Sequence, residues 1–341
     1  MQTMIEDQFQ KCVLAAPDHI LVATDLTDLE YLVPHAIAQA RACGAQVTFI
    51  HAISPGRVAR ADSKAFSYRA VSSIDPAKVV RDARLTLLGV ERQVEADGIT
   101  CEMRVRHGNA SEVIRRELSH TGATRLIVGT HGRGEFGHLT LGPVTHQLLT
   151  SIDIPVFVAG PHTHGTSGQA TPRRLLHPVS LMGDYQDSVQ LALNVAQTCR
   201  AELTLLHVIH PDILDGMNPE RILEWAGNAL RALAPSPDDL VPRVNTLVTC
   251  GEVAEEILKT AKQIHADWIV LGAEGGYRAW PFHECGAYRV LAASACPVLT
   301  CPNVQHYEID GPEKRHFASV TELHQQDSIA DQRSRRFARI S

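Results

Sequence analysis

One stretch of the sequence has the residue types and spacing of a phosphate-binding loop. Two residues separate Gly129 from Gly132, and nine residues separate Gly132 from Gly142. Glycine lets backbone N–H groups approach an anion closely, and a helix that begins after the last glycine adds the positive end of its dipole. These features suit the phosphates of a nucleotide.

Two further segments could complete such a site, because each of them ends an apolar, strand-like run. They are Ala23-Thr24-Asp25 and His51-Ala52-Ile53. In an open parallel sheet, ligands bind beyond the carboxyl ends of the strands, where the strand order reverses, so we expect both segments to meet the glycine loop there. An acid such as Asp25 suits a ribose hydroxyl, an adenine amino group or a bound magnesium ion. The alternative is that the glycines serve only to form a tight loop.

The elements that would position this loop occur twice in the chain. Residues 125–129 match residues 268–272 at a shift of 143, and residues 45–53 match residues 201–209 at a shift of 156. A repeat of about 150 residues is a duplicated domain, since solenoid repeats are roughly 20–50 residues long. The sequence therefore predicts two like domains, of which only the first keeps a well-formed glycine loop.

Each copy alternates short apolar runs with helical patterns, which predicts an α/β fold with a parallel sheet and helices on both faces. In the first copy we expect strands at 20–23, 47–53, 100–105, 126–129 and 154–159, and helices at 31–43, 75–96, 110–118 and from Gly142. In the second copy we expect strands at 175–180, 203–209, 244–248, 269–272 and 297–300, and helices at 188–199, from Asn218, at 254–264 and at 287–293.

The glycine spacing, Asp25 and the closing run Ile154-Pro155-Val156 together resemble the universal stress protein family. The resemblance covers residues 17–160 and, with weaker motifs, 172–302, as expected for a tandem member. It implies that each domain is doubly wound around a five-stranded parallel sheet in the order 3-2-1-4-5. It also implies that the two domains pair within the chain through their last strands, and that two chains form a homodimer.

The predicted domain organisation follows from these limits. We expect an N-terminal extension at 1–16, a first domain at 17–160 with the candidate nucleotide site, and a linker at 161–172 that is rich in Gly, Ser, Thr, His and Pro. A second domain with a degenerate site follows at 173–302. Residues 303–341 lack a clear period and are expected to be a disordered tail.

The resemblance also assigns residues to an adenine nucleotide, ATP or AMP, with magnesium as an accompanying ion. Ala23, Thr24 and Asp25 would line the adenine and ribose side, Ala52 would offer backbone contacts to the base, Gly129, His131 and Gly132 would hold ribose and phosphate, and Gly142, Val144 and Thr145 would cap the phosphates.

One departure from the family pattern concerns the phosphates. The family places serine or threonine directly after the third glycine, whereas this chain has Pro143. Proline has neither an N–H nor a hydroxyl, so two phosphate donors are lost, although proline is well tolerated in a first helical turn. Since each charge-assisted hydrogen bond contributes roughly 1.5–3 kcal/mol, ATP would bind more weakly by several tenfold steps. AMP or adenosine could still be held, with Val144 and Thr145 as the remaining donors.

The second copy is predicted to bind no nucleotide cofactor. Pro178-Val179-Ser180-Leu181 stands where the first copy has Asp25, and the gap from Gly275 to Gly286 is ten residues. Glu274 and Glu284 would bring negative charge to the loop. Bulky side chains there either fill the loop themselves or line a pocket for a neutral or apolar ligand; they are Tyr277, Trp280 and Phe282.

Composition excludes several classes of function. The net charge of −6 over 341 residues argues against general nucleic-acid binding, which needs a basic face. No apolar run reaches the roughly 18–20 residues of a membrane span, and the first residues do not form a signal peptide, so we expect a cytoplasmic protein. The eight cysteines contain no Cys-x-x-Cys pair and are read as buried free thiols, and the eighteen histidines show no zinc spacing, so no metal site is predicted.

The preferred hypothesis is therefore a non-enzymatic stress-response protein. Its first domain binds an adenine nucleotide, and it regulates through unidentified protein partners. The alternatives are a scaffold or dimerisation protein without a ligand, and a slow nucleotide hydrolase, for which the sequence supplies no evident base. His51 and His207 recur at matched strand ends. Because the degenerate copy keeps its histidine, we predict a structural role for both.

Overall fold

The computed structural model describes residues 16–54, 75–130, 141–161, 163, 171–181, 183, 185–214, 218–235, 243–272 and 286–302. Residues 55–74, most of the predicted linker and of the predicted N-terminal extension, and the predicted tail lie outside these described residues. Within them, none of the helices is both long enough and apolar enough to cross a membrane.

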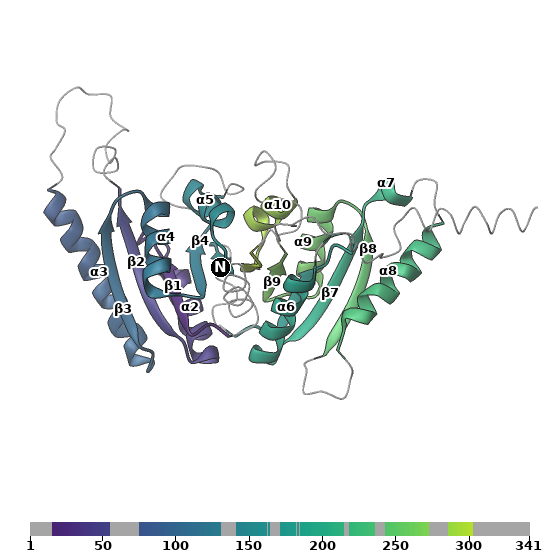
Figure 1. Cartoon of the computed structure of the whole chain (residues 1–341), viewed down its shortest axis with the longest axis horizontal. Coiled ribbons are helices and arrows are strands. Elements are labelled where there is room, and N and C mark those ends of the chain that lie inside the picture. The colour runs from purple at the N-terminus through teal and green to yellow at the C-terminus, as the bar shows by residue number, and fades with distance from the viewer. Residues whose placement is uncertain are drawn as a thin grey trace, which may run out of the picture. The chain divides into compact units, whose positions relative to one another are not determined.

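The first domain alternates strands and helices in the predicted order (Figure 1). Its elements are β1 (His19–Ala23), α2 (Leu29–Cys43), β2 (Gln46–Ile53), α3 (Pro76–Ala96), β3 (Cys101–His107), α4 (Ala110–Thr121), β4 (Arg125–Gly129), α5 (Pro143–Ser151) and β5 (Val156–Ala159).

The second domain repeats this order with one short additional helix after its second strand. Its elements are β6 (Arg174–Pro178), α6 (Gln186–Cys199), β7 (Glu202–Ile209), α7 (Pro211–Leu214), α8 (Pro219–Leu233), β8 (Val244–Cys250), α9 (Val253–Gln263), β9 (Trp268–Leu271), α10 (Gly286–Ala293) and β10 (Val298–Thr300). The four-residue helix α7 is the element that the periodicity did not predict.

The ten strands form one sheet in the order β3-β2-β1-β4-β5-β10-β9-β6-β7-β8. Each half of this list has the order 3-2-1-4-5 when read from its outer edge, so the predicted strand order is confirmed in both domains. The strands pair in parallel within each domain, and β5 pairs antiparallel with β10, with Phe157 opposite Leu299. The predicted pairing of the domains through their last strands is therefore also confirmed.

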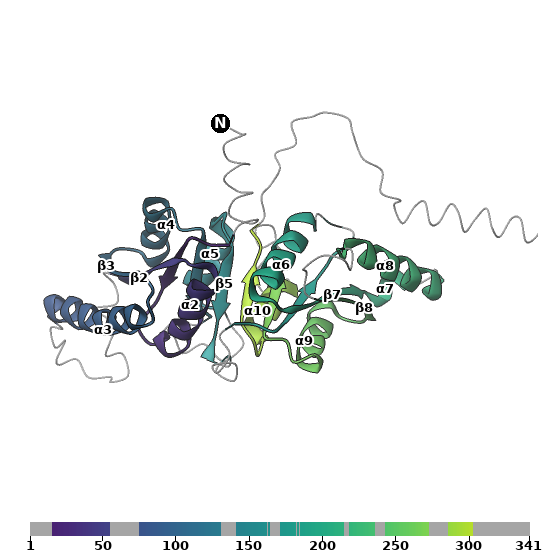
Figure 2. The same cartoon turned by 90° about the horizontal axis from the view of Figure 1, so that it is seen from below.

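Helices cover both faces of the sheet because successive strand residues point to opposite faces. Figure 2 shows α3 and α4 on opposite sides of β2 and β3. Ile20 and Val22 belong to one apolar core with residues of α2, α3, α6 and α8, and Leu21 belongs to the other core with residues of α4, α5, α9 and α10. Each of these two cores thus contains residues of both domains.

Local sequence signals set the ends of several elements. The side chain of Asp75 accepts a hydrogen bond from Ala77 N at 3.0 Å, and that of Asn218 accepts one from Glu220 N at 3.0 Å, as N-cap residues before a proline should. Gly44 ends α2 with φ of 69°, in the left-handed region that glycine favours. These caps match the predicted helix limits.

The last strand of each domain begins later than predicted. β5 starts at Val156 and β10 at Val298, directly after Pro155 and Pro297. Proline cannot donate to the strand ladder, so it contributes only its carbonyl, which accepts from Leu126 N at 3.1 Å in the first domain and from Ile269 N at 3.0 Å in the second.

Candidate functional site

The strand order reverses beside β1, whose neighbours are β2 and β4. Ala23 at the end of β1 is in register with Ile50 of β2 and Val128 of β4, and Thr24 N donates to Ile50 O at 3.0 Å. The segments after β1, β2 and β4 therefore start at one edge of the sheet. This is the place where the sequence predicted that Asp25, Ala52 and Gly129 would come together.

The turn after β1 holds the carboxylate of Asp25 in a defined position. Asp25 Oδ1 accepts from Thr27 N at 2.9 Å and from Thr27 Oγ1 at 2.5 Å, and the residue is half-buried. Leu26 lies between them with φ of 74°, a left-handed conformation that costs a non-glycine residue roughly 1–2 kcal/mol. The turn thus has an unfavourable backbone conformation, and it holds the Asp25 carboxylate in one orientation at the carboxyl end of β1.

Asp28 is a second acid at this edge, which the sequence analysis did not single out. It is 3% exposed, and its Oδ1 accepts a hydrogen bond from Thr24 Oγ1. Burial raises the pKa of Asp28 to about 7, and the nearby charge of Asp25 adds to this, while hydrogen bonds from Thr24 and the backbone act in the opposite direction. The signal that could have revealed it is its place three residues after Asp25, directly before α2.

Gly129 at the end of β4 has no room for a side chain, because Asp28 lies against it. A Cβ atom at position 129 would come 2.9 Å from Asp28 Oδ2 and 3.5 Å from the hydroxyl of Tyr31. The Tyr31 hydroxyl also has a raised pKa, mainly because of burial and next because of the charge of Asp28. A glycine is therefore required here by packing, whether or not a ligand binds.

The described part of the glycine loop shows how α5 begins. Gly142 is the N-cap residue, and its N–H donates to Thr130 O at 2.7 Å. Pro143 occupies the first turn as predicted, and Val144 is 38% exposed. The first N–H groups of a helix have no partner inside the helix, so the start of α5 presents donors near β4. His131 and Gly132 lie outside the described residues.

Thr145 uses its hydroxyl inside the protein. Its Oγ1 donates to Gly129 O at 2.7 Å, and the residue is 6% exposed. This contact ties the first turn of α5 to the end of β4. The hydroxyl hydrogen that the sequence reading assigned to a phosphate is engaged by this carbonyl, which leaves the backbone N–H of Thr145 as its donor for an anion.

His51 and His207 have the same backbone partner in the two domains. His51 Nδ1 lies 2.9 Å from Thr24 O, and His207 Nδ1 lies 2.8 Å from Val179 O. Both residues are buried, and burial lowers the pKa of His207. Each imidazole thus supports the carbonyl that follows the first strand of its domain, which agrees with the predicted structural role. Ala52, the residue after His51, is half-buried.

Among the described residues at the corresponding edge of the second domain, a serine stands where the first domain has Asp25. Val179 N donates to Leu206 O at 2.7 Å, as Thr24 N does to Ile50 O, so Ser180 takes the place of Asp25. A Cβ atom at Gly272 would meet Ser188 Oγ at 3.0 Å, where Gly129 meets a carboxylate. The aromatic residues and the two glutamates predicted to crowd this loop lie outside the described residues.

A hydrogen bond connects the two domains at the described end of the glycine loop. Leu141 N, directly before Gly142, donates to the hydroxyl of Tyr288 at 3.0 Å. Tyr288 lies in α10 of the second domain. The second domain therefore helps to fix the start of α5 in the first.

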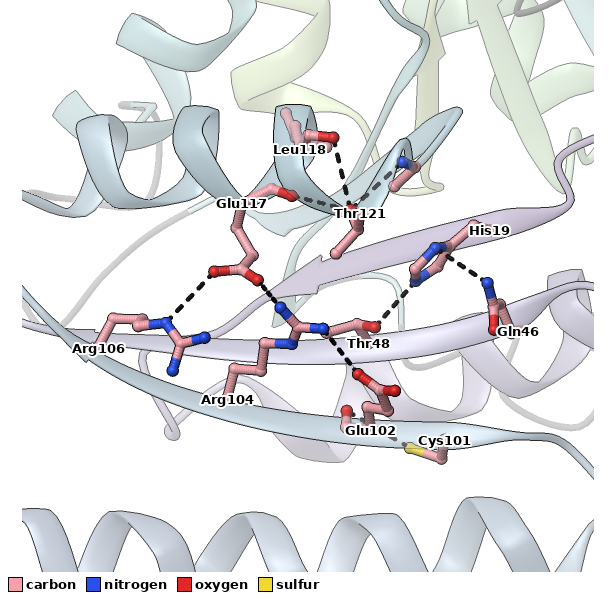
Figure 3. A network of polar contacts seen from close by, with 11 residues as sticks. His19, Gln46, Thr48, Cys101, Glu102, Arg104, Arg106, Glu117, Leu118 and Thr121 are labelled. Atoms are coloured by element: carbon pink, nitrogen blue, oxygen red, sulfur yellow. Dashed lines mark hydrogen bonds and ion pairs between the residues drawn. The ribbon is translucent and has the colours of Figure 1, made fainter.

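A polar network crosses the sheet of the first domain away from this edge (Figure 3). Glu117 of α4 is buried, and it pairs with Arg104 of β3 and with Arg106 Nε at 3.4 Å. Arg104 also contacts Glu102 Oε2 at 2.8 Å and lowers the pKa of Glu102 through this hydrogen bond. Because these charges have partners of opposite sign, we read the network as the structural attachment of α4 to β3.

A metal centre has no support in the part of the chain that the structure describes, where no three His, Cys, Asp or Glu side chains gather in a suitable group.

Comparison with known proteins gives the same division into two domains as the fold. The model of the Universal stress protein family matches residues 17–160 and 172–302. Among solved structures, a universal stress protein from Archaeoglobus fulgidus aligns with a TM-score of 0.61 at 18% identity, over 84% of this chain and 98% of that chain.

Two structures from Pseudomonas aeruginosa are also similar. A protein of unknown function from strain PAO1 aligns with a TM-score of 0.58 at 17% identity, over 86% of this chain and 94% of that one. A putative universal stress protein from strain UCBPP-PA14 has a TM-score of 0.57 at 16% identity, over 84% and 94% of the two chains. A search among curated proteins gave no match.

Proposed function

Because this chain belongs to the universal stress protein family, with two copies of the domain in tandem, we propose that its first domain binds an adenine nucleotide and its second domain serves as a structural partner. The chain would then act in the cytoplasm as a non-enzymatic stress-response protein that contacts other proteins. Nucleotide occupancy of the first domain would regulate those contacts.

The observation that carries this proposal is the position of Asp25. Its carboxylate is held by two hydrogen bonds from Thr27, remains half-exposed, and lies where β1 ends between β2 and β4. Leu26, in the same turn, has a left-handed backbone conformation that is unfavourable for a non-glycine residue. An oriented acid at the switch point of a parallel sheet suits a ribose hydroxyl or an adenine amino group.

The nucleotide would use the residues that the family resemblance assigns. Ala23, Thr24, Asp25 and Ala52 would surround the base and ribose, and Gly129, His131, Gly132, Gly142, Val144 and Thr145 would surround the ribose and phosphates. Two features favour AMP over ATP: Pro143 supplies no donor, and the Thr145 hydroxyl is bound to Gly129 O. Magnesium enters the proposal only as an ion that accompanies the phosphates of ATP.

Isothermal titration of the full chain with AMP and ATP tests the proposal. We expect saturable binding of one nucleotide per chain, with AMP bound at least as tightly as ATP. Asp25→Ala should abolish this binding. Ser180→Ala, the matched change in the second domain, should leave it unchanged. Equal affinity of the wild type and Asp25→Ala, or loss of binding in Ser180→Ala alone, would refute the assignment.

The second candidate function is a scaffold that binds proteins and no nucleotide. The engaged hydroxyl of Thr145 and the packing requirement at Gly129 favour it, because both give the loop a structural purpose. Absence of any nucleotide binding by the wild type would select this function. A slow nucleotide hydrolase is the third candidate, and it requires ATP turnover above background that disappears in Asp25→Ala.

A further inference from the structure

A crevice between the two domains contains buried hydrogen-bond donors that have no acceptor among the described residues. It is lined by residues of α2 and β4 from the first domain and of α6 and β9 from the second, and it is a narrow crevice that is partly open to solvent. Arg125, the first residue of β4, is 4% exposed, and Gln39 of α2 is 3% exposed. The crevice is distinct from the proposed nucleotide site, because Arg125 and Gly129 stand at opposite ends of β4.

The hydrogen bond between Arg125 and Gln39 uses only some of the donors of these two side chains. Arg125 Nη1 donates to Gln39 Oε1 at 3.2 Å. Arg125 Nε and Gln39 Nε2 are both buried and have no hydrogen-bond partner among the described residues. Both atoms are donors, so the missing group must be an acceptor. Native proteins rarely leave such donors unpaired, and two of them in one crevice point to a bound acceptor.

The missing group must also carry negative charge. Arg125 has no carboxylate partner among the described residues, and burial lowers its pKa. A guanidinium nevertheless stays protonated in proteins, so a buried positive charge remains without a counter-charge. Cys43 and Cys199 line the same crevice, but burial raises the pKa of both thiols, that of Cys199 to about 11. The thiols are therefore uncharged at neutral pH and leave Arg125 uncompensated.

The walls of the crevice define the chemistry of the anion. Among the described lining residues, Arg125 is the one cation and the other polar residues are neutral, so a monoanion matches the charge. Much of the remaining wall is apolar, and the apolar lining residues include Pro17, Ala38, Leu191, Val195 and Trp268. Such a wall suits a ligand with a small apolar body and a planar head with two acceptor atoms.

We propose that this interdomain crevice binds a small monocarboxylate, whose two oxygens accept hydrogen bonds from Arg125 Nε and Gln39 Nε2 and whose aliphatic part lies against the apolar wall. The ligand would contact both domains at once. Its binding would therefore stabilise their pairing, independently of any nucleotide.

The probes are sodium butyrate and butyramide, its neutral analogue, added to the full chain at constant ionic strength. Isothermal titration and thermal unfolding report binding. We expect butyrate to bind and to raise the melting temperature, and butyramide to bind at least tenfold more weakly. Equal effects of the two compounds would overturn the proposal, as would no binding of butyrate by the wild type.

Variants locate the site. Arg125→Met should weaken butyrate binding at least tenfold, and without ligand it should melt at or above the wild-type temperature, because an uncompensated buried charge is removed. Gln39→Leu should also weaken binding. The matched control is Arg174→Met, at the exposed first residue of β6, which should bind butyrate like the wild type.

A further variant covers the case in which Arg125→Met does not fold. Thr198→Tyr places a bulky side chain at the exposed lining residue of α6 and keeps Arg125, so it should abolish the response to butyrate. An unchanged response would overturn the proposal.

Discussion

Asp28 Oδ2 lies 2.9 Å from the position that a Cβ atom on Gly129 would take, which is closer than a real Cβ atom comes to its neighbours. The backbone at the end of β4 thus packs against the Asp28 carboxylate, directly before α2. Gly129→Ala should destabilise the protein by about 1–3 kcal/mol, as overpacking of a buried site does. Urea unfolding measures this change.

The matched control is Gly89→Ala in α3, where an added Cβ meets nothing within 4 Å. Alanine is the better helix former, so this variant should gain about 0.5–1 kcal/mol. Asp28→Ala should restore part of the stability lost in Gly129→Ala when the two are combined. Strictly additive effects of the two changes would show that the contact has no energetic consequence.

The raised pKa of Asp28 predicts a pH dependence of stability. An acid whose pKa rises from 3.8 to about 7 on folding binds its proton more tightly in the folded protein. Its contribution to stability is therefore greatest at low pH and is lost as the pH rises from about 4 to about 7. Asp28→Asn removes this loss, so the variant should gain on the order of 2–4 kcal/mol relative to the wild type between these pH values.

Urea unfolding of both proteins at several pH values checks this prediction. The variant keeps an acceptor for Thr24 Oγ1, so the hydrogen bond at this position is preserved. A difference in stability that stays constant from pH 4 to pH 8 would contradict the expected ionisation of Asp28.

Pro143 is predicted to limit the affinity for ATP. Pro143→Ser supplies both an N–H and a hydroxyl at the start of α5, and each charge-assisted hydrogen bond to phosphate contributes roughly 1.5–3 kcal/mol. ATP binding should therefore strengthen by at least tenfold, with a smaller gain for AMP. Pro143→Ala restores the N–H alone and should give an intermediate affinity. Three equal dissociation constants from isothermal titration would argue that the phosphates do not reach α5.

Tyr288 should stabilise the glycine loop across the domain boundary. Tyr288→Phe removes the acceptor of Leu141 N and leaves this buried N–H unpaired, which should cost about 1–3 kcal/mol. Hydrogen exchange at the Leu141 amide should accelerate, and any nucleotide affinity should fall. Tyr185→Phe, directly before α6, provides a control in the same domain. Unchanged exchange at Leu141 in Tyr288→Phe would mean that the two domains do not communicate through this bond.

The architecture could be predicted because its signals are local. Apolar runs bounded by glycine and proline mark the strands, and Asp75-Pro76 and Asn218-Pro219 mark helix starts that the structure caps as expected. The duplication then supplied the second domain from the first. The starts of β5 and β10 lie later than predicted, since proline lacks the N–H that extends a ladder, and several other limits moved by one to three residues. The short helix α7 has too few residues to show a period.

The candidate site was harder to predict because it depends on directions and distances in three dimensions. Nothing in the spacing of Thr145 shows that its hydroxyl turns back to Gly129 O. The pKa of Asp28 depends on burial beneath β4, which lies a hundred residues further along the chain. Arg125 reads as an ordinary strand residue, and the crevice that it lines is completed by α6 and β9 of the other domain.

The antiparallel contact between β5 and β10 also determines how copies of this chain can meet. In a single domain of this topology the fifth strand would be an edge strand, available to pair with a second molecule. Here the fifth strands of the two domains, β5 and β10, already pair with each other within the chain. Among the described strands, the borders that remain are β3 and β8. A dimer in which strands of two chains pair edge to edge would therefore use β3 or β8, and its formation should not compete with the pairing of β5 and β10.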